Sequence, residues 1–272
     1  MTRKQSPTPA PSPGTGDSGS VGAQSHRPAT YREEQIGDCR LILSDCRDIL
    51  PTLGPVDAVV TDPPYGVSYD GSTTKHKRKD GVGYASFDDT PEEIAAVCVP
   101  AVRAAVALAR SAVITPGNAC SHLYDPPRAQ GAIFYPGGAN AGPWGFVCSQ
   151  PLFYYGKDPF LALEKGRRPN GFSTSEGAEK NGHPCPKPIG QTRWMVARVS
   201  FAGETVLDPF MGSGTTGVAC ANLGRSFIGI EREPTYFDIA CRRIEEAYRQ
   251  PRLFDEPAPK PVQVGLFDGG PA

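Results

Sequence analysis

The order of apolar and polar positions divides the chain into alternating strands and helices between residues 31 and 250. Short continuous apolar runs, typical of buried parallel strands, occur at 40–44, 56–61, 111–115, 205–207 and 226–230. Helices are predicted at 48–53, 90–110 (kinked or split at Pro100), 188–201, 215–223 and 235–249. Residues 146–155 predict a pair of strands. This alternation predicts an α/β fold with a mostly parallel, doubly wound sheet, similar in layout to a Rossmann fold.

Two tails and one irregular segment interrupt this pattern. Residues 1–30 and 251–272 are rich in Pro, Gly and Ser, so we expect both to be disordered. Residues 31–118 form the first half of the domain and 183–250 the second. Between them, residues 119–182 carry many Gly and Pro and scattered aromatics, which predicts a small irregular insertion.

Composition and charge narrow the class of protein. Lys and Arg number 28 against 29 Asp and Glu, so a nucleic acid would have to be bound by a local basic patch. No apolar run is long enough to span a membrane, and the N-terminal residues do not resemble a signal peptide. The eight cysteines lack zinc-site spacing and several lie in apolar runs. We therefore predict no metal and a reduced, cytoplasmic chain.

The strand predicted at 56–61 runs directly into Asp62-Pro63-Pro64-Tyr65. Two consecutive prolines supply no N–H group, so the strand must end there and leave backbone carbonyls without partners. Asp62 and the Pro63 carbonyl are two acceptors beside the aromatic face of Tyr65. A planar heterocycle with an amino group could donate to both acceptors while stacking on the ring. A plain turn would explain the prolines, but not acceptors and an aromatic together.

The strand at 205–207 leads into a second motif, Asp208-Pro-Phe-Met-Gly-Ser-Gly-Thr-Thr216. Gly212 and Gly214 allow a tight turn and a close approach of backbone to a ligand. Glu231, at the end of the next strand, suits hydrogen bonding to the hydroxyls of a ribose. The loop lacks the lysine of a phosphate-binding loop, so a nucleoside without a phosphate fits better. On its own, this loop could equally be an ordinary turn between a strand and a helix.

Taken together, these motifs resemble the S-adenosylmethionine-dependent DNA amino-methyltransferases of the circularly permuted β class. DPPY precedes DPFMGSGTT, which FIGIERE follows, and His183-Pro-Cys-Pro-Lys187-Pro matches the H-P-x-x-K-P element of that family. Leu43-Ser-Asp45-Cys resembles its G-D-C element, with Ser44 in place of Gly. The resemblance covers residues 36–248 and implies that 119–182 is the target-recognition segment.

The resemblance also implies site residues. Asp62, Pro63, Pro64 and Tyr65 would hold a base that is flipped out of double-stranded DNA. The methyl donor S-adenosylmethionine would be bound by Asp45, His183, Lys187, Asp208, Phe210, Gly212, Gly214, Thr215 and Glu231. Accepting hydrogen bonds from the amino group would direct its lone pair toward the methyl group, so catalysis would rest on positioning and electrostatics.

Asp at the first position of the tetrapeptide, with Tyr at the fourth, is more often associated in this family with adenine N6 than with cytosine N4. We therefore expect an adenine-N6 methyltransferase, solitary or part of a restriction-modification pair. A cytosine-N4 enzyme is the alternative. Methylation of a protein glutamine is less favoured, because such enzymes more commonly have Asn at that position. A DNA-binding protein without catalysis is less favoured too, because both motifs are intact.

Three further features concern partners. Lys75, Lys77, Arg78 and Lys79 follow DPPY closely and could contact DNA phosphates, although such a loop could also be merely solvated. The short recognition segment suggests a brief target site or a homodimer. The tail repeats Q-x-x-L-F from Gln250 to Phe254 and from Gln263 to Phe267. This pattern resembles the peptide that binds bacterial sliding clamps, but it could also pack on its own domain.

Overall fold

The computed structural model describes residues 31–67, 88–142, 144–178 and 187–250. Within these residues the strands are β1 (Arg32–Ile36), β2 (Cys39–Leu43), β3 (Val56–Thr61), β4 (Ala109–Ile114), β5 (Ala129–Phe134), β6 (Asn140–Gly142), β7 (Gly145–Val147), β8 (Ser149–Gly156), β9 (Phe172–Ser173), β10 (Thr205–Asp208) and β11 (Ser226–Glu231). The helices are α1 (Cys46–Ile49), α2 (Pro91–Glu93), α3 (Val99–Leu108), α4 (Pro159–Ala162), α5 (Ile189–Val199), α6 (Thr215–Leu223) and α7 (Pro234–Arg249).

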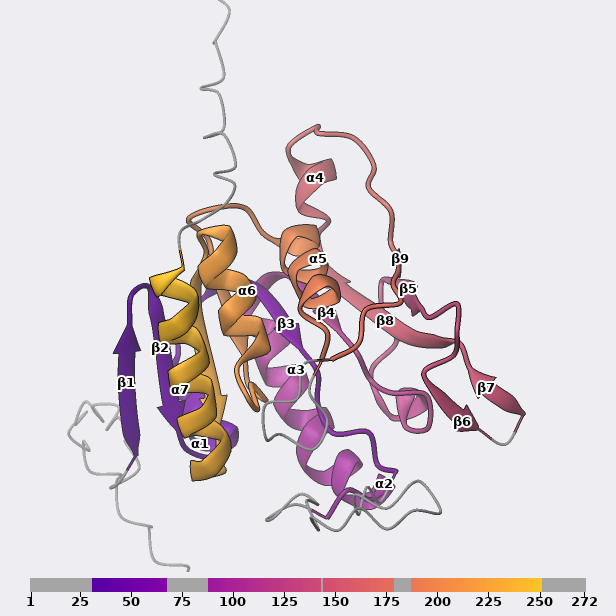
Figure 1. Ribbon diagram of the computed structural model, residues 1–272, viewed down its shortest axis with the longest axis horizontal. Coiled ribbons are helices and arrows are strands. Elements are labelled where there is room, and N and C mark those ends of the chain that lie inside the picture. The colour runs from indigo at the N-terminus through magenta and orange to yellow at the C-terminus, as the bar shows by residue number, and fades with distance from the viewer. Residues whose placement is uncertain (1–30, 68–87, 143, 179–186, 251–272) are drawn as a thin grey trace, which may run out of the picture.

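Nine strands form one mixed sheet in the order β1-β2-β11-β10-β3-β4-β8-β5-β9 (Figure 1). The central strands β2, β11, β10, β3 and β4 are parallel, and β1 and β8 pair antiparallel at their flanks. The predicted α/β fold with a mostly parallel sheet is therefore confirmed. The predicted disordered tails lie outside the described residues.

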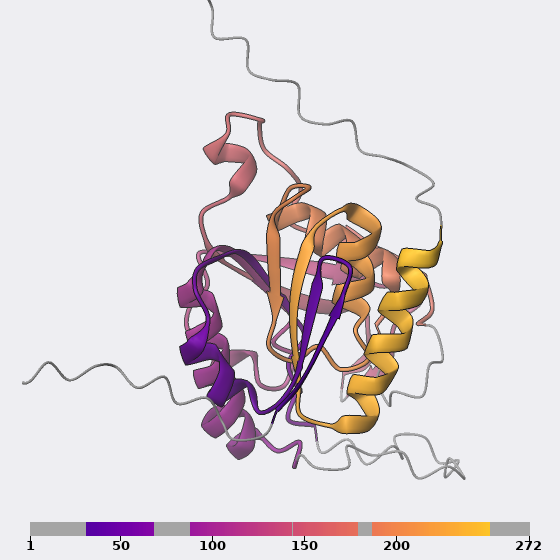
Figure 2. The ribbon, with the colours of Figure 1, turned by 90° about the vertical axis from the view of Figure 1, so that its left-hand side faces the viewer.

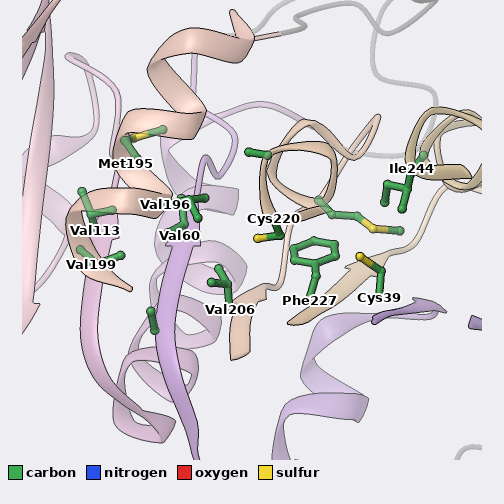
Figure 3. Packing of buried hydrophobic residues seen from close by; sticks show 14 of the residues in the cluster. Cys39, Val60, Val113, Met195, Val196, Val199, Val206, Cys220, Phe227 and Ile244 are labelled. Atoms are coloured by element: carbon green, nitrogen blue, oxygen red, sulfur yellow. The ribbon is translucent and has the colours of Figure 1, made fainter. Parts of the chain in front are cut away.

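Helices cover both faces of the sheet (Figure 2). On one face α5, α6 and α7 pack on side chains such as Val60, Val206 and Phe227 (Figure 3). On the other face α1 and α3 pack on Val59, Leu207 and their neighbours. Adjacent residues of one strand face opposite sides, so strands buried on both faces read as unbroken apolar runs. This explains why the sequence pattern indicated the central strands.

Two predictions differ from the structure in detail. The helix predicted at 90–110 begins as α2, continues as a π-helix over Ile94–Cys98 and ends as α3, with Pro100 in the first turn of α3. Pro100 has no N–H to bond to the preceding turn, and the π-helix lies directly before it, where the regular hydrogen-bond pattern of an α-helix is already interrupted. Residues 146–155 do form strands, but the prediction that these strands pair with each other is wrong. β7 pairs with β6, whereas β8 pairs with β4 and β5.

The segment 119–182 is joined more closely to the rest of the domain than its composition indicated. β8 pairs antiparallel with β4 along Ile114–Ser111, and β5 pairs antiparallel with β8. Its described part thus extends the central sheet and brings residues of the insertion beside the carboxyl end of β3. Only β6 and β7 form a separate hairpin among the described strands (Figure 1).

Candidate active site

The two sequence motifs meet at one pocket. β3 and β10 are parallel neighbours, so the loops that follow them leave the same edge of the sheet. We call Asp62–Gly66 the DPPY loop and Asp208–Thr216 the glycine loop. Both line a pocket that also contacts Asp45, Gln191 and Glu231. At its floor the Thr61 hydroxyl donates to Asp208 Oδ1 over 2.6 Å, which ties the two strand ends together.

Asp62 is surrounded by donors. Its Oδ1 accepts hydrogen bonds from the hydroxyls of Tyr65 and Thr115. Its Oδ2 lies 3.0 Å from Lys187 Nζ, an ion pair that links the two halves of the domain. Each carboxylate oxygen can accept more than one hydrogen bond, so Oδ2 keeps acceptor capacity toward the pocket. The side chain is about a quarter exposed, as a group that meets a ligand must be.

Tyr65 is held by three residues besides Asp62. Its hydroxyl accepts from Gln150 Nε2 and, over 2.7 Å, from Lys187 Nζ, and the same ammonium lies 4.4 Å from the ring centroid. Gly117 adjoins the ring so closely that a Cβ there would lie 2.7 Å from Tyr65 Cδ1. Burial, followed by the charge of Asp62, raises the pKa of Tyr65 well above its usual value. The phenol therefore stays protonated and can donate to Asp62.

The DPPY loop ends in a turn at Gly66. The backbone there has a positive φ of 69°, and a Cβ would lie 2.5 Å from Cys120 Sγ, so glycine is required. The buried Asp89 side chain accepts from the N–H of Gly66 over 2.6 Å and from that of Val67 over 3.2 Å. This carboxylate fixes the direction in which the chain leaves the pocket.

The glycine loop is held mainly by Asp208. This side chain is 2% exposed and accepts from Phe210 N over 3.0 Å and from the Thr216 hydroxyl over 2.6 Å, besides Thr61. Burial raises the pKa of Asp208 to about 6 in spite of these donors. Gly214 begins α6 with a φ of 78°. From α7, Arg243 donates to the Ser213 carbonyl over 2.6 Å.

Two further carboxylates lie on the pocket wall. Glu231 accepts from Gly212 N over 3.0 Å and from Glu233 N over 2.8 Å, and burial raises its pKa to about 7. Asp45 caps α1 by accepting from Arg47 N and pairs with the Arg47 guanidinium over 2.6 Å. The hydrogen bonds from Arg47 hold the pKa of Asp45 below its usual value.

Most of the residues singled out in the sequence lie around this pocket. Its lining includes Asp45, Asp62, Pro63, Pro64, Tyr65, Lys187, Asp208, Phe210, Gly212, Thr215 and Glu231. Gly214 lies behind the lining as the cap of α6. The other predicted site residues, His183, Lys75, Lys77, Arg78 and Lys79, lie outside the described residues.

Sequence reasoning missed Thr115, Gln150, Tyr135 and Gln191, which all belong to the polar surroundings of Tyr65 and Asp62. Thr115 could have been found, since it ends the apolar run at 111–115 that was predicted as a strand, and in the structure that strand pairs with β3. Gln150, Tyr135 and Gln191 carry no local signal, because their position depends on how β5, β8 and α5 pack.

Within the described part of the chain, no group of three or more His, Cys, Asp or Glu side chains could hold a metal ion. None of the helices found there combines the length and apolar character that crossing a membrane requires. The described cysteines are free thiols.

Comparison with known proteins gives consistent matches. Residues 157–242 match the family model described as DNA methylase. The Type II methyltransferase M2.DpnII of Streptococcus pneumoniae is 37% identical over 97 residues, covering 34% of this chain and 36% of that protein. The Type II methyltransferase M.HinfI of Haemophilus influenzae is 42% identical over 72 residues, covering 26% of this chain and 20% of that protein. Each match thus spans about a third or less of the relative's length.

Two solved structures share the fold. The PvuII DNA methyltransferase, described as cytosine-N4-specific, superimposes with a TM-score of 0.55 at 14% identity and covers 79% of this chain and 92% of its own. The putative DNA modification methylase TTHA0409 from Thermus thermophilus, complexed with S-adenosyl-L-methionine, has a TM-score of 0.50 at 20% identity. The alignment covers 76% of this chain and 93% of the TTHA0409 chain. These likenesses confirm the methyltransferase fold, and the predicted resemblance to DNA methyltransferases is confirmed with it.

Proposed function

We propose that this chain transfers a methyl group from S-adenosylmethionine to the N6 amino group of an adenine that has been rotated out of double-stranded DNA. The observation that carries the proposal is the meeting of the DPPY loop and the glycine loop at a single pocket. One loop offers a carboxylate to an amino group, and the other offers the surroundings of a nucleoside. The matches to DNA methyltransferases support the class of substrate.

The donors and acceptors around the glycine loop fit the cofactor. Glu231 carries acceptor oxygens for two ribose hydroxyls, and Gly212 beside it has no side chain that would block a close approach. Phe210 supplies an apolar surface to the same wall. Asp45, at the start of α1, would lie near the adenine edge of the cofactor. His183 stays a prediction, because it lies outside the described residues.

S-adenosylmethionine, when bound, supplies a methyl group on a sulfonium cation, which needs no further activation as an electrophile. The residues of this chain then have to prepare the nucleophile. The exocyclic nitrogen of adenine is weakly nucleophilic because its lone pair is delocalised into the ring. Asp62 Oδ2, which keeps acceptor capacity, would accept one N–H of that group, and the Pro63 carbonyl would accept the other. These bonds favour the localised lone pair and the positive charge that develops on nitrogen.

Lys187 must respond when the amino group enters. Its ammonium pairs with Asp62 Oδ2 and lies over the face of Tyr65, where a flipped base would stack. The same ammonium also contacts the Tyr65 hydroxyl, so it has a second partner to keep if it leaves the carboxylate. Lys187 thus neutralises Asp62 before substrate binds and has to move aside for the base.

The proposal is tested by incubating the full chain with methyl-labelled S-adenosylmethionine and unmethylated genomic DNA, followed by nucleoside analysis. We expect label in N6-methyladenine from the wild type and none from the Asp62→Ala variant. Label in N4-methylcytosine would keep the mechanism and overturn the choice of base. No label in DNA, with the cofactor bound, would overturn the proposal.

Other predicted partners extend this proposal. The tail segments at Gln250 to Phe254 and Gln263 to Phe267 extend beyond the described residues, and the basic cluster at Lys75 to Lys79 lies outside them. Docking of the tail on a sliding clamp, contacts of the basic cluster with DNA phosphates, a homodimer and a cytoplasmic location therefore stay predictions. A pull-down with both Leu-Phe pairs deleted tests the clamp, and unchanged binding would end that hypothesis.

A further inference from the structure

A row of hydrogen-bonded side chains connects α5 to the DPPY loop, and we call it the polar row. It begins at Gln191, which is fully buried in α5. Tyr135, which follows β5, lies with its hydroxyl 2.8 Å from Gln191 Oε1 and 3.1 Å from Gln150 Oε1. Gln150, 8% exposed on β8, donates from Nε2 to the Tyr65 hydroxyl, and Tyr65 donates to Asp62. Neither Gln150 nor Tyr135 belongs to either motif.

The protons of the polar row can be assigned from its ends. Asp62, as a carboxylate, only accepts, so the single proton of Tyr65 goes to Asp62. The Tyr65 oxygen must then accept from its other neighbours, Lys187 and Gln150. This requires the amide nitrogen of Gln150 to face Tyr65, which turns its oxygen toward Tyr135. The orientation of the Gln150 amide therefore follows from the charge of Asp62.

The single proton of Tyr135 likewise determines the orientation of the Gln191 amide. Tyr135 has one proton, so it cannot donate to the amide oxygens of both Gln150 and Gln191. Gln191 Nε2 has no hydrogen-bond partner among the described residues. Exchanging the amide oxygen and nitrogen of Gln191 gives this nitrogen the Tyr135 oxygen as its acceptor, and each hydrogen bond of the row then has one donor and one acceptor. All donors in the row point the same way, from α5 toward Asp62.

This direction has a consequence for Asp62. Its Oδ1 accepts from both Tyr65 and Thr115 and is thereby saturated, whereas among the described residues Oδ2 is paired with Lys187 only. We propose that Gln150, held by Tyr135, is a positioning residue for methyl transfer, because it keeps the Tyr65 proton on Oδ1 and so leaves Oδ2 for the substrate amino group. This inference rests on the proposed function. It also gives the segment 119–182, which was expected to recognise the target, a part in completing the catalytic site.

Gln150→Glu is the sharpest test because it keeps the shape of the side chain and reverses one hydrogen bond. The introduced carboxylate cannot donate to Tyr65 and competes with Asp62 for the Tyr65 proton. At about pH 8 we expect the single-turnover rate of methyl transfer to fall about 10- to 100-fold, with the affinity for S-adenosylmethionine unchanged. The rate relative to wild type should recover at lower pH, where the introduced carboxyl is protonated and donates to Tyr65 again.

Tyr135→Phe provides a second test in case Gln150→Glu folds poorly. It removes the hydroxyl that orients the Gln150 amide, and we expect a loss of about 3- to 10-fold in the same rate. Tyr154→Phe is the matched control, since the Tyr154 hydroxyl donates to the Asn170 carbonyl away from the pocket. We expect the control to keep the wild-type rate.

The outcomes separate this inference from the proposed function. If the wild type transfers no methyl group to DNA, the proposed function fails. If the wild type is active and Gln150→Glu matches it at about pH 8, the inference alone fails. A rate loss in Gln150→Glu that stays constant relative to wild type across the pH range would also overturn it, because a purely structural defect would behave in that way.

Discussion

The two loops of the pocket are held in opposite ways. The glycine loop is held mainly from within its own half of the domain, since Asp208 bonds to Phe210 and Thr216 while Glu231 and Arg243 bond to Gly212 and Ser213. Thr61 is the distant residue that also donates to Asp208. The DPPY loop depends on residues far along the chain. Tyr65 and Asp62 contact Thr115, Gln150 and Lys187 at separations of 53, 85 and 122 residues. The glycine loop thus takes most of its contacts from one half of the domain, whereas the DPPY loop draws on both halves and on the insertion.

This difference suggests a division of labour. Under the proposed function, a cofactor site held mainly from one half of the domain can exist before the target arrives. The DPPY loop is contacted by both halves and by the insertion, so a ligand that binds to one of these regions can change its geometry. Four substitutions test this difference between the loops, and their expected effects fall from about 1000-fold in rate to about 2 kcal/mol in stability.

Asp62→Ala is expected to have the largest effect, and this effect is on the rate of methyl transfer. It removes the acceptor for the amino group, and the methyl-transfer rate should fall about 1000-fold. Thr115→Val, which removes only one donor to the same carboxylate, should cost far less, and single-turnover assays on unmethylated DNA compare the two. Equal losses in the two variants would contradict the role given to Asp62.

Asp208→Ala should act on stability. The change leaves the donors of Thr61, Thr216 and Phe210 in a buried site without their acceptor. At about 1 to 1.5 kcal/mol for each, the free energy of unfolding should fall by about 4 kcal/mol. Urea denaturation measures this loss, and a change close to zero would show that the glycine loop is not held as described.

Asp208→Asn should change how stability depends on pH. The pKa of Asp208 is raised to about 6 in the folded protein, above its usual value of 3.8. Between these values the folded state keeps a proton that the unfolded state has lost, so this contribution is full below the lower value and is lost as the pH rises through the upper one. The asparagine side chain keeps an oxygen acceptor at this position but does not titrate.

The wild type should therefore lose roughly 3 kcal/mol relative to Asp208→Asn between about pH 4 and pH 7. Denaturation curves of both proteins across this range give the difference directly. A constant difference would mean that Asp208 titrates alike in the folded and unfolded states.

Gly214→Ala should have the smallest effect of the four. The residue has a φ of 78°, and a Cβ would lie 2.8 Å from the Ala240 Cβ of α7. Strain and the shift of α7 together should lower the free energy of unfolding by about 2 kcal/mol. Gly203→Ala is a matched control, because Gly203 also has a positive φ but a Cβ there would meet nothing within 4 Å. Equal melting temperatures for the two variants would remove the packing part of this account.

The same contrast explains how much the sequence could predict. The central strands, the helices around them and the pocket residues Asp208 and Glu231 follow from local patterns, because apolar runs and strand ends are local features. The strand β1 was not predicted, since its residues REEQI are mostly charged and exposed and it gains its place by pairing with β2. The π-helix of Ile94–Cys98 has no signature that a count of apolar positions detects.

Within the site, sequence reasoning predicted the groups that line the pocket but not the groups that orient them. Asp62 and Tyr65 belong to a recognisable tetrapeptide. Gln150 has no sequence motif around it, and it reaches the site because β8 pairs with β4. The sequence also indicated a free aromatic face at Tyr65. Lys187 lies over that face because the second half of the domain packs against the first, and no local pattern in the sequence indicates this contact.

The affinity of the Asp62→Ala variant for S-adenosylmethionine, measured by isothermal titration calorimetry beside wild type and Glu231→Ala, tests the division of labour most directly. We expect Asp62→Ala to bind the cofactor as the wild type does while its methyl transfer is lost, and Glu231→Ala to bind it at least about 10-fold more weakly. Loss of cofactor binding in Asp62→Ala, or wild-type binding in Glu231→Ala, would contradict it.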